Sequence, residues 1–196
     1  MVDCAHDLGA IGPTGRGYLE IQDFVGGPDV LMGSFSKTFA SNGGFVATNV
    51  RELKHGLRYA CGPSTFSNAM SPVNAAVVSA CIDIVQSEEG AELRRRLIEN
   101  VQYLRQRLQQ EQFEVLGQES AIVPVILGDN RISRLMTKYA LATGGIVNLV
   151  EYPAVSRNTC RWRLQVMAFH TRTQIERFVE IAVHARQAAT EELECT

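Results

Sequence analysis

The sequence predicts an α/β fold in two parts, because short apolar strand patterns alternate with amphipathic helix patterns and the pattern changes near Gly90. In the first part, two apolar runs at residues 30–32 and 45–47 lie on either side of a loop, as two short buried strands would. The second part alternates strands and helices, which is typical of an α+β domain with helices on one face of a sheet. We therefore expect two domains, residues 1–90 and 91–196.

The remaining elements of the first part follow from local signals. Residues 3–17 contain glycines at positions 9, 12, 15 and 17, which predict a loop of tight turns that a ligand could approach closely. This loop matches neither the Walker A pattern nor the Rossmann fingerprint. Residues 50–59 predict a short helix and residues 61–71 an irregular loop. Pro72 then opens an Ala- and Val-rich helix, 73–86, of the kind that is usually buried.

The second part begins with a long amphipathic helix over residues 91–110, whose leucines recur at three-to-four spacing. We expect the N-cap of the last helix to be Thr171 or Thr173 and the tail from residue 190 to be frayed. The other predicted elements are strands at 113–116, 122–127, 146–150 and 161–168, and helices at 131–142, ending at Gly144-Gly145, and 173–189.

Composition narrows the function class. The chain has 196 residues, is 45% apolar and 20% charged, and carries a net charge of −2, which is ordinary for a soluble globular protein and does not indicate nucleic-acid binding. The densest basic run, residues 94–96, is interpreted as a solvated helix face. Five cysteines without metal-ligand spacing predict reduced thiols and no metal site. We find no transmembrane or signal pattern, so the expected location is cytoplasmic.

The candidate reactive and ligand-binding side chains are concentrated in the stretch from Gly33 to Thr48. Lys37 is surrounded there by small hydroxyl residues, namely Ser34, Ser36, Thr38 and Ser41. A lysine near apolar walls can become a carbonyl-reactive amine, and hydroxyls with exposed N–H groups can receive a phosphate. Together these groups are typical of a pyridoxal phosphate site. The alternative is a solvated lysine in an ordinary turn.

Asp3 and His6 are the polar groups that open the glycine-rich loop. They could serve a ligand, or Asp3 could cap a turn while His6 bonds to the backbone. The sequence around them leaves both readings open.

The order of motifs along the chain resembles the α-oxoamine synthase family. The motifs are Asp3-Cys-Ala-His6, Gly12-Pro-Thr-Gly-Arg-Gly17, Gly33-Ser-Phe-Ser-Lys37, Gly43-Gly44 and Arg163-Leu-Gln-Val-Met-Ala-Phe-His170-Thr171. Members of this family are pyridoxal phosphate enzymes with the aspartate aminotransferase-like fold, type I, and include 8-amino-7-oxononanoate synthase and serine palmitoyltransferase. The bacterial serine palmitoyltransferases are particularly similar. The resemblance implies that residues 1–90 belong to the large cofactor-binding domain and residues 91–196 form the small domain.

The resemblance also implies roles for the residues that bind the cofactor. Asp3 would pair with the pyridine nitrogen, and His6 would bond to the phenolic oxygen or the substrate carbonyl. Lys37 would form the Schiff base and then act as general base and acid. Ser34 would bind the phosphate, and Ser67 would reach the phosphate of the neighbouring subunit in a homodimer.

Arg163 would hold the carboxylate of the amino acid through its planar fork; the alternative is a structural arginine paired with a helix carboxylate. His170 is interpreted as a support for the turn between strand and helix. The implied reaction condenses serine, glycine or alanine with the thioester of acyl-CoA or acyl carrier protein, releasing CO2 and an α-amino ketone. An aminotransferase or lyase on the same fold, or an inactive regulatory partner, are the alternatives.

Two departures from the family pattern stand out. Cys4 replaces the acidic residue of the Asp-Glu-Ala-His motif, where we expect it to support the site without taking part in chemistry. Family members are also about twice as long, so we expect this chain to be the C-terminal half of such an enzyme or to be completed by another chain. A half-sheet alone would expose apolar surface.

Overall fold

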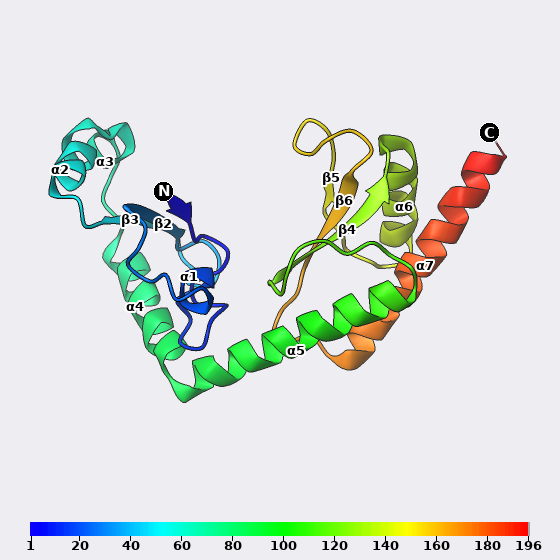
Figure 1. Ribbon diagram of the computed structural model, residues 1–196, viewed down its shortest axis with the longest axis horizontal. Coiled ribbons are helices and arrows are strands. Elements are labelled where there is room, and N and C mark those ends of the chain that lie inside the picture. The colour runs from blue at the N-terminus through cyan, green and yellow to red at the C-terminus, as the bar shows by residue number, and fades with distance from the viewer. Residues whose placement is uncertain (196) are drawn as a thin grey trace. The chain divides into compact units, whose positions relative to one another are not determined.

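The computed structural model describes residues 1–195 and divides into two compact units, Met1–Arg94 and a second unit that begins at Arg95 (Figure 1). Each unit has its own three-stranded sheet. The long helix α5, Glu88–Gln110, runs through the division between them. Whether the two units are the large and small domains of the predicted ranges stays a prediction.

The sheet of the first unit has the strand order β1-β2-β3, with β1 and β2 parallel and β2 and β3 antiparallel. Its strands are β1 (Val2–Asp3), β2 (Val30–Ser34) and β3 (Gly44–Thr48). Its helices, besides the start of α5, are α1 (Tyr18–Ile21), α2 (Arg51–Ala60), α3 (Gly62–Phe66) and α4 (Pro72–Gln86).

Three predictions for this unit were wrong. Residues 61–71 are not entirely irregular, because α3 forms directly after α2 with a proline in its first turn. The helix after Pro72 forms as predicted but is not buried, since Val78 is its one buried residue and Val73 is 72% exposed. The strand β3 is likewise mostly exposed. Apolar patterning identified these elements, but the residues described in this unit do not cover their apolar faces.

The second unit contains an antiparallel sheet of order β4-β6-β5. Its elements are the strands β4 (Ile122–Gly128), β5 (Leu149–Val150) and β6 (Cys160–Gln165), and the helices α6 (Asn130–Ala142) and α7 (Arg172–Glu194). Trp162 on the central strand is fully buried, packs its ring against Phe178 with centroids 6.2 Å apart, and donates from Nε1 to Thr137 Oγ1 at 2.9 Å. This side chain is the centre of the unit's core.

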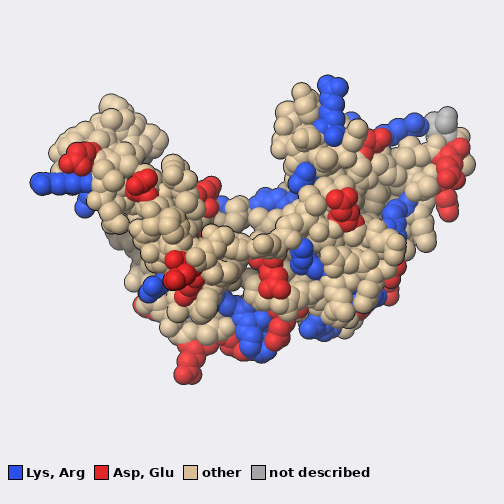
Figure 2. Space-filling view, in the orientation of Figure 1, with Lys and Arg blue, Asp and Glu red and all other residues tan. Residues whose placement is uncertain are grey.

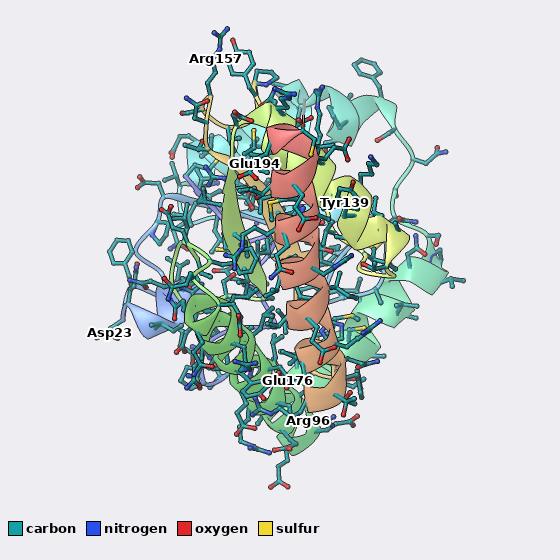
Figure 3. The ribbon with its side chains drawn as sticks, turned by 90° about the vertical axis from the view of Figure 1, so that its right-hand side faces the viewer. Asp23, Arg96, Tyr139, Arg157, Glu176 and Glu194 are labelled. Carbon is teal, nitrogen blue, oxygen red and sulfur yellow. The ribbon has the colours of Figure 1, made fainter. Side chains whose placement is uncertain are left out.

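Glu176, in the N-terminal half of α7, links this helix to α5 (Figure 3). Its carboxylate accepts hydrogen bonds from the Tyr103 hydroxyl and from Arg107 Nε, the latter at 2.9 Å. These two donors lower the pKa of Glu176.

Several predicted boundaries in the second unit were wrong. Residues 113–116 form a single bridge between Val115 and Val125 and no full strand, and only residues 149–150 of the predicted strand 146–150 are paired. The tail is helical as far as Glu194, because buried alanines such as Ala189 keep α7 packed. Two details were confirmed: α6 ends just before Gly144-Gly145, and Thr171 is the N-cap of α7.

Charges of both signs are interspersed over the face drawn in Figure 2, in keeping with the small net charge. Among residues 1–195, no helix combines the length and the apolar character that crossing a bilayer requires. All five cysteines are free thiols, as predicted.

Candidate functional site

Parallel pairing brings two of the motifs to one edge of the first sheet. Asp3 pairs with Met32 in the register of β1 and β2, so both strands end at the same side. The loop with His6 leaves β1 there, and Ser34 ends β2 just before Lys37. The carboxyl ends of parallel strands are where ligands bind in open α/β sheets, so this edge is the candidate site.

At the end of β1, Asp3 is exposed and its Oδ1 accepts a hydrogen bond from the backbone N–H of Ala5 at 2.8 Å. This is the turn-capping contact that the sequence left open as an alternative, and it occupies only one of the two carboxylate oxygens with a described bond. His6 is exposed as well. Next to them, the N–H of Cys4 donates to the carbonyl of Met32 at 2.9 Å and extends the parallel pairing by one residue.

The thiol of Cys4 is fully buried beneath this edge. Burial first, and then the carboxylates of Asp7 and Asp3, raise its pKa to about 11. The thiol is therefore neutral near pH 7, which agrees with a supporting position and does not reproduce the acidic residue of the family motif.

The glycine-rich loop is organised by its own carboxylates. Asp7 Oδ2 accepts from the N–H of Tyr18 at 2.9 Å, and Glu20 accepts from the N–H groups of Thr14 at 3.0 Å and Arg16 at 3.1 Å. Burial acts to raise the pKa of Glu20, but these hydrogen bonds outweigh it and lower the pKa below its ordinary value. The side chain of Glu20 therefore holds the loop as an acceptor of converging donors.

The loop's glycines have positive φ, as the predicted tight turns require. A Cβ on Gly17, for example, would lie 2.5 Å from Asp7 Oδ2. Gly9 is equally close-packed, because a Cβ there would lie 2.7 Å from the methyl group of Thr38 on the neighbouring loop. The described close approaches are thus to the chain itself.

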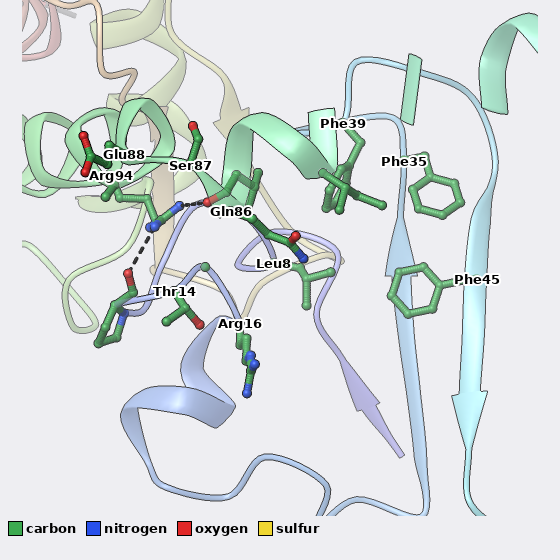
Figure 4. Close-up of a pocket in the computed structure, with 15 residues that line it drawn as sticks. Leu8, Thr14, Arg16, Phe35, Phe39, Phe45, Gln86, Ser87, Glu88 and Arg94 are labelled. Carbon is green, nitrogen blue, oxygen red and sulfur yellow. Dashed lines mark hydrogen bonds between the residues drawn. The ribbon is translucent and has the colours of Figure 1, made fainter. Parts of the chain in front are cut away.

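Arg94 fastens this loop to the helices behind it (Figure 4). Its side chain is 8% exposed, and its guanidinium donates to the carbonyls of Val85 at 2.7 Å and Pro13 at 3.1 Å. The interpretation of residues 94–96 as a solvated face was therefore wrong at Arg94. Beside it, Phe35, Phe39 and other apolar side chains line a hollow of ≈ 650 Å³.

Lys37 lies on a loop whose base is closed by backbone hydrogen bonds. The N–H of Phe35 donates to the Gly43 carbonyl at 3.0 Å, and the N–H of Ser41 donates to the Phe35 carbonyl at 2.8 Å. The ring of Phe35 contacts that of Phe39 edge-on, with centroids 5.7 Å apart. Lys37 itself is exposed, so the described residues do not form the apolar enclosure expected around its amine.

Ser34 lies at the start of the same loop. Its hydroxyl is 2.7 Å from that of Ser36 and also accepts from the Ser36 N–H at 3.2 Å. The two hydroxyls and the turn of backbone between them gather hydrogen-bonding groups one to three residues from Lys37. This grouping is suited to an anionic oxygen cluster such as a phosphate.

Ser67 is placed elsewhere in the first unit. It is exposed, donates to the Pro63 carbonyl, and lines a hollow of ≈ 1310 Å³ together with Gly43, Lys54 and Arg58. Neither Lys37 nor Ser34 lines that hollow. Among residues 1–195, the described hydrogen bond of Ser67 is to Pro63 and not to the loop that carries Lys37.

Arg163 belongs to the second unit, where it lies on β6 opposite Pro124. Its side chain is half-buried, and its N–H donates to the Asn148 carbonyl at 2.8 Å. His170 supports the turn after β6, as expected, because its Nδ1 accepts from the N–H of Met167 at 3.3 Å. Sequence reasoning missed Asn100, whose buried amide donates to the carbonyls of Met167 at 3.1 Å and His170 at 2.8 Å.

The fold and the motif order can now be compared with known proteins. Residues 1–181 match the family described as aminotransferase class I and II, and the chain belongs to that family. The sequence is 34% identical to serine palmitoyltransferase of Bacteriovorax stolpii over 186 residues, which cover 95% of this chain and 44% of that protein. It is 35% identical to 2-amino-3-ketobutyrate coenzyme A ligase of Escherichia coli K12, covering 92% of this chain and 45% of that protein.

Solved structures agree. The structure superposes on serine palmitoyltransferase with a PLP internal aldimine at a TM-score of 0.87 and 32% identity, covering 96% of this chain and 47% of that one. Serine palmitoyltransferase of Sphingomonas wittichii gives a TM-score of 0.87 at 28% identity, covering 97% and 47%. The predicted type I α/β fold is confirmed. The chain spans about half the length of the curated relatives it matches.

Proposed function

We propose that this chain is part of a pyridoxal phosphate-dependent α-oxoamine synthase, which condenses a small amino acid with an acyl thioester and releases CO2. The observation that carries the proposal is the parallel pairing of β1 and β2, which puts the Asp3 carboxylate and the Lys37 loop at one sheet edge. The similarity to enzymes of this class along nearly the whole chain supports it.

The residues at this edge fit the cofactor. A carboxylate, a primary amine and a pair of hydroxyls are the groups that pyridoxal phosphate sites require. Asp3 would face the pyridine nitrogen, Lys37 the aldehyde carbon, Ser34 the phosphate and His6 the phenolic oxygen. When bound, the cofactor supplies an electron sink that stabilises negative charge on the α-carbon of an amino acid.

Two residues of the chain would then transfer the proton and bind the substrate. The amine of Lys37 removes the proton from the α-carbon and can return one later, as a general base and acid. Arg163 donates two parallel N–H bonds to the substrate carboxylate, which fixes the orientation of the amino acid. The exposed position of Lys37 leaves its amine accessible for both tasks.

We further propose that the protein acts as a cytoplasmic homodimer. Large apolar side chains are exposed over α2, α3 and α4, including Tyr59, Phe66 and Val73. Exposed large apolar side chains on consecutive elements favour association. Ser67 lies on the same stretch and would serve the phosphate site of the partner subunit.

The test is the visible absorbance of the purified chain after addition of pyridoxal phosphate. We expect a band in the wild type that Lys37→Ala removes and that Lys54→Ala, another exposed lysine, keeps. Serine, glycine or alanine should perturb the band, and palmitoyl-CoA added with the preferred amino acid should release CoA. Exchange of amino groups without release of CoA would instead favour an aminotransferase, and a band that persists in Lys37→Ala would contradict the assignment of the amine.

A further inference from the structure

A third hollow, which lies in the second unit and is lined by Arg163, has a volume of ≈ 760 Å³. It lies between the segment before β5, the end of β6 and the N-terminal part of α7. Arg163 lines it, so the hollow adjoins the residue that the proposed function assigns to the amino acid carboxylate. The side chains of serine, glycine and alanine are far too small to fill a space of this size, which is within the range of sites for larger organic ligands.

The floor of this hollow is apolar. Leu104, Leu164, Val166 and Ile175 line it and are all buried. Among the residues that line it, Arg163 is the only lysine, arginine, aspartate or glutamate. The hollow thus combines one cationic group with a hydrocarbon surface, which suits a ligand that has a polar end and an apolar chain.

The mouth of the hollow carries large apolar side chains that are exposed to solvent. Ile146 is 92% exposed and Met167 is 57% exposed, and both line the hollow. Exposed large apolar residues beside an apolar cavity mark a surface that a ligand or partner covers. Methionine is well suited to contact flexible hydrocarbon, because its side chain adapts its shape.

We propose that this hollow binds the hydrocarbon chain of the acyl thioester, with Ile146 and Met167 at its entrance. The inference rests on the proposed function, because that function supplies both the acyl substrate and the role of Arg163. An acyl chain is the occupant because the buried lining side chains are hydrocarbon, and Arg163, the one charged lining group, is assigned by the proposed function to the amino acid carboxylate.

The experiment is a calorimetric titration of the full chain with hexanoyl-CoA and decanoyl-CoA, which differ only in hydrocarbon length. Burial of a methylene strengthens binding by up to about fourfold, so decanoyl-CoA should bind the wild type at least about tenfold more tightly. Ile146→Glu places a charge at the mouth and should reduce this preference to about twofold or less. Leu141→Glu is the matched control, because Leu141 is an exposed apolar residue of the same unit that does not line the hollow.

Equal binding of the two thioesters, no binding of either, or equal losses in Ile146→Glu and Leu141→Glu would overturn the inference. The Lys37-dependent absorbance band is recorded on the same samples. A band with no chain-length preference means that the acyl subsite is wrong while the proposed function stands. A preference that Ile146→Glu removes, in a protein that never forms the band, means that the hollow binds acyl chains and that the proposed function fails.

Discussion

Cys4 illustrates how a single residue can keep its place in a motif and lose its charge. The family pattern has an acidic residue there, whereas the thiol of Cys4 is buried and has a pKa of about 11. At pH 8 only about one thiol in a thousand would be ionised, and the thiolate is the reactive form. Iodoacetamide should therefore modify the exposed Cys195 in the native chain well before Cys4, as peptide mass spectrometry would report. Comparable labelling of both would contradict the buried position.

Glu20 gives a prediction with a defined pH dependence. Its pKa in the folded chain is lowered, so its contribution to stability is present above the ordinary carboxyl pKa and is lost as pH falls through the lowered value. Glu20→Gln should reduce the free energy of unfolding at pH 7 by about 1 kcal/mol, after allowance for solvent exposure. Urea denaturation of the wild type and of Glu20→Gln at pH 7 and at pH 3 measures this loss in the free energy of unfolding. The difference between variant and wild type should shrink at pH 3, and an undiminished difference would argue against a charged acceptor.

Residue-level predictions succeeded where local chemistry decides and failed where packing decides. Thr171 could be proposed as a cap because the helix pattern after it begins sharply. Arg94 and Asn100 could not be recognised, because each looks like an ordinary helix residue and its partners lie elsewhere in the chain, in the case of Asn100 67 to 70 residues away. The identity of a polar residue in the sequence does not reveal which backbone carbonyls its side chain will hydrogen-bond in the fold.

At the scale of elements, the capping box at the start of α7 is a local interaction that stabilises one helix end. Thr171 Oγ1 accepts from the Gln174 N–H at 3.2 Å, and Gln174 Oε1 accepts from the Thr171 N–H at 2.9 Å. Thr171→Ala should lower the free energy of unfolding by about 1 kcal/mol. Thr173→Ala, inside the first turn, is the control and should have a much smaller effect in the same urea titration. If the two variants lose equal stability, the cap does not account for it.

Helices were predicted more accurately than strands. Pro72 and an Ala- and Val-rich run identified α4, and amphipathic periodicity over many residues identified α5 and α7. The short strand β5 and the single bridge at Val115 depend on which neighbour happens to pair with them, and a window of four or five residues does not encode that. The end of α7 was missed because the buried face of its last turns is made of alanines, whose apolar signal is weak.

At the scale of the molecule, the apolar surface over α2, α3 and α4 is the feature with the largest consequence. Phe66 is 91% exposed, although burying a phenylalanine typically contributes about 1.5–3 kcal/mol. If this surface is the dimer interface that we propose, the wild type should sediment as a dimer and Phe66→Glu should shift it toward the monomer. Phe24→Glu, at another exposed phenylalanine outside this surface, should leave the sedimentation unchanged. A monomeric wild type would contradict the proposed interface.

Motif order predicted the fold and the family from the sequence, because each motif corresponds to a strand end or loop that the fold must position. The assembly of the site is less accessible to sequence. The chain spans about half the length of its relatives, and the exposure of Lys37 shows that its neighbours in this structure do not enclose its amine. Enclosure depends on surfaces brought from far away in sequence or from a partner, which local patterns do not describe.

The proposed function requires the amine of Lys37 to bond covalently to pyridoxal phosphate. The most direct test is to add the cofactor to the full chain, reduce with borohydride and locate the added mass by peptide mass spectrometry. We predict a single stoichiometric adduct on Lys37, with Lys54 and Lys138 unmodified at the same cofactor concentration. Adducts spread over the exposed lysines, or none on Lys37, would contradict the claim.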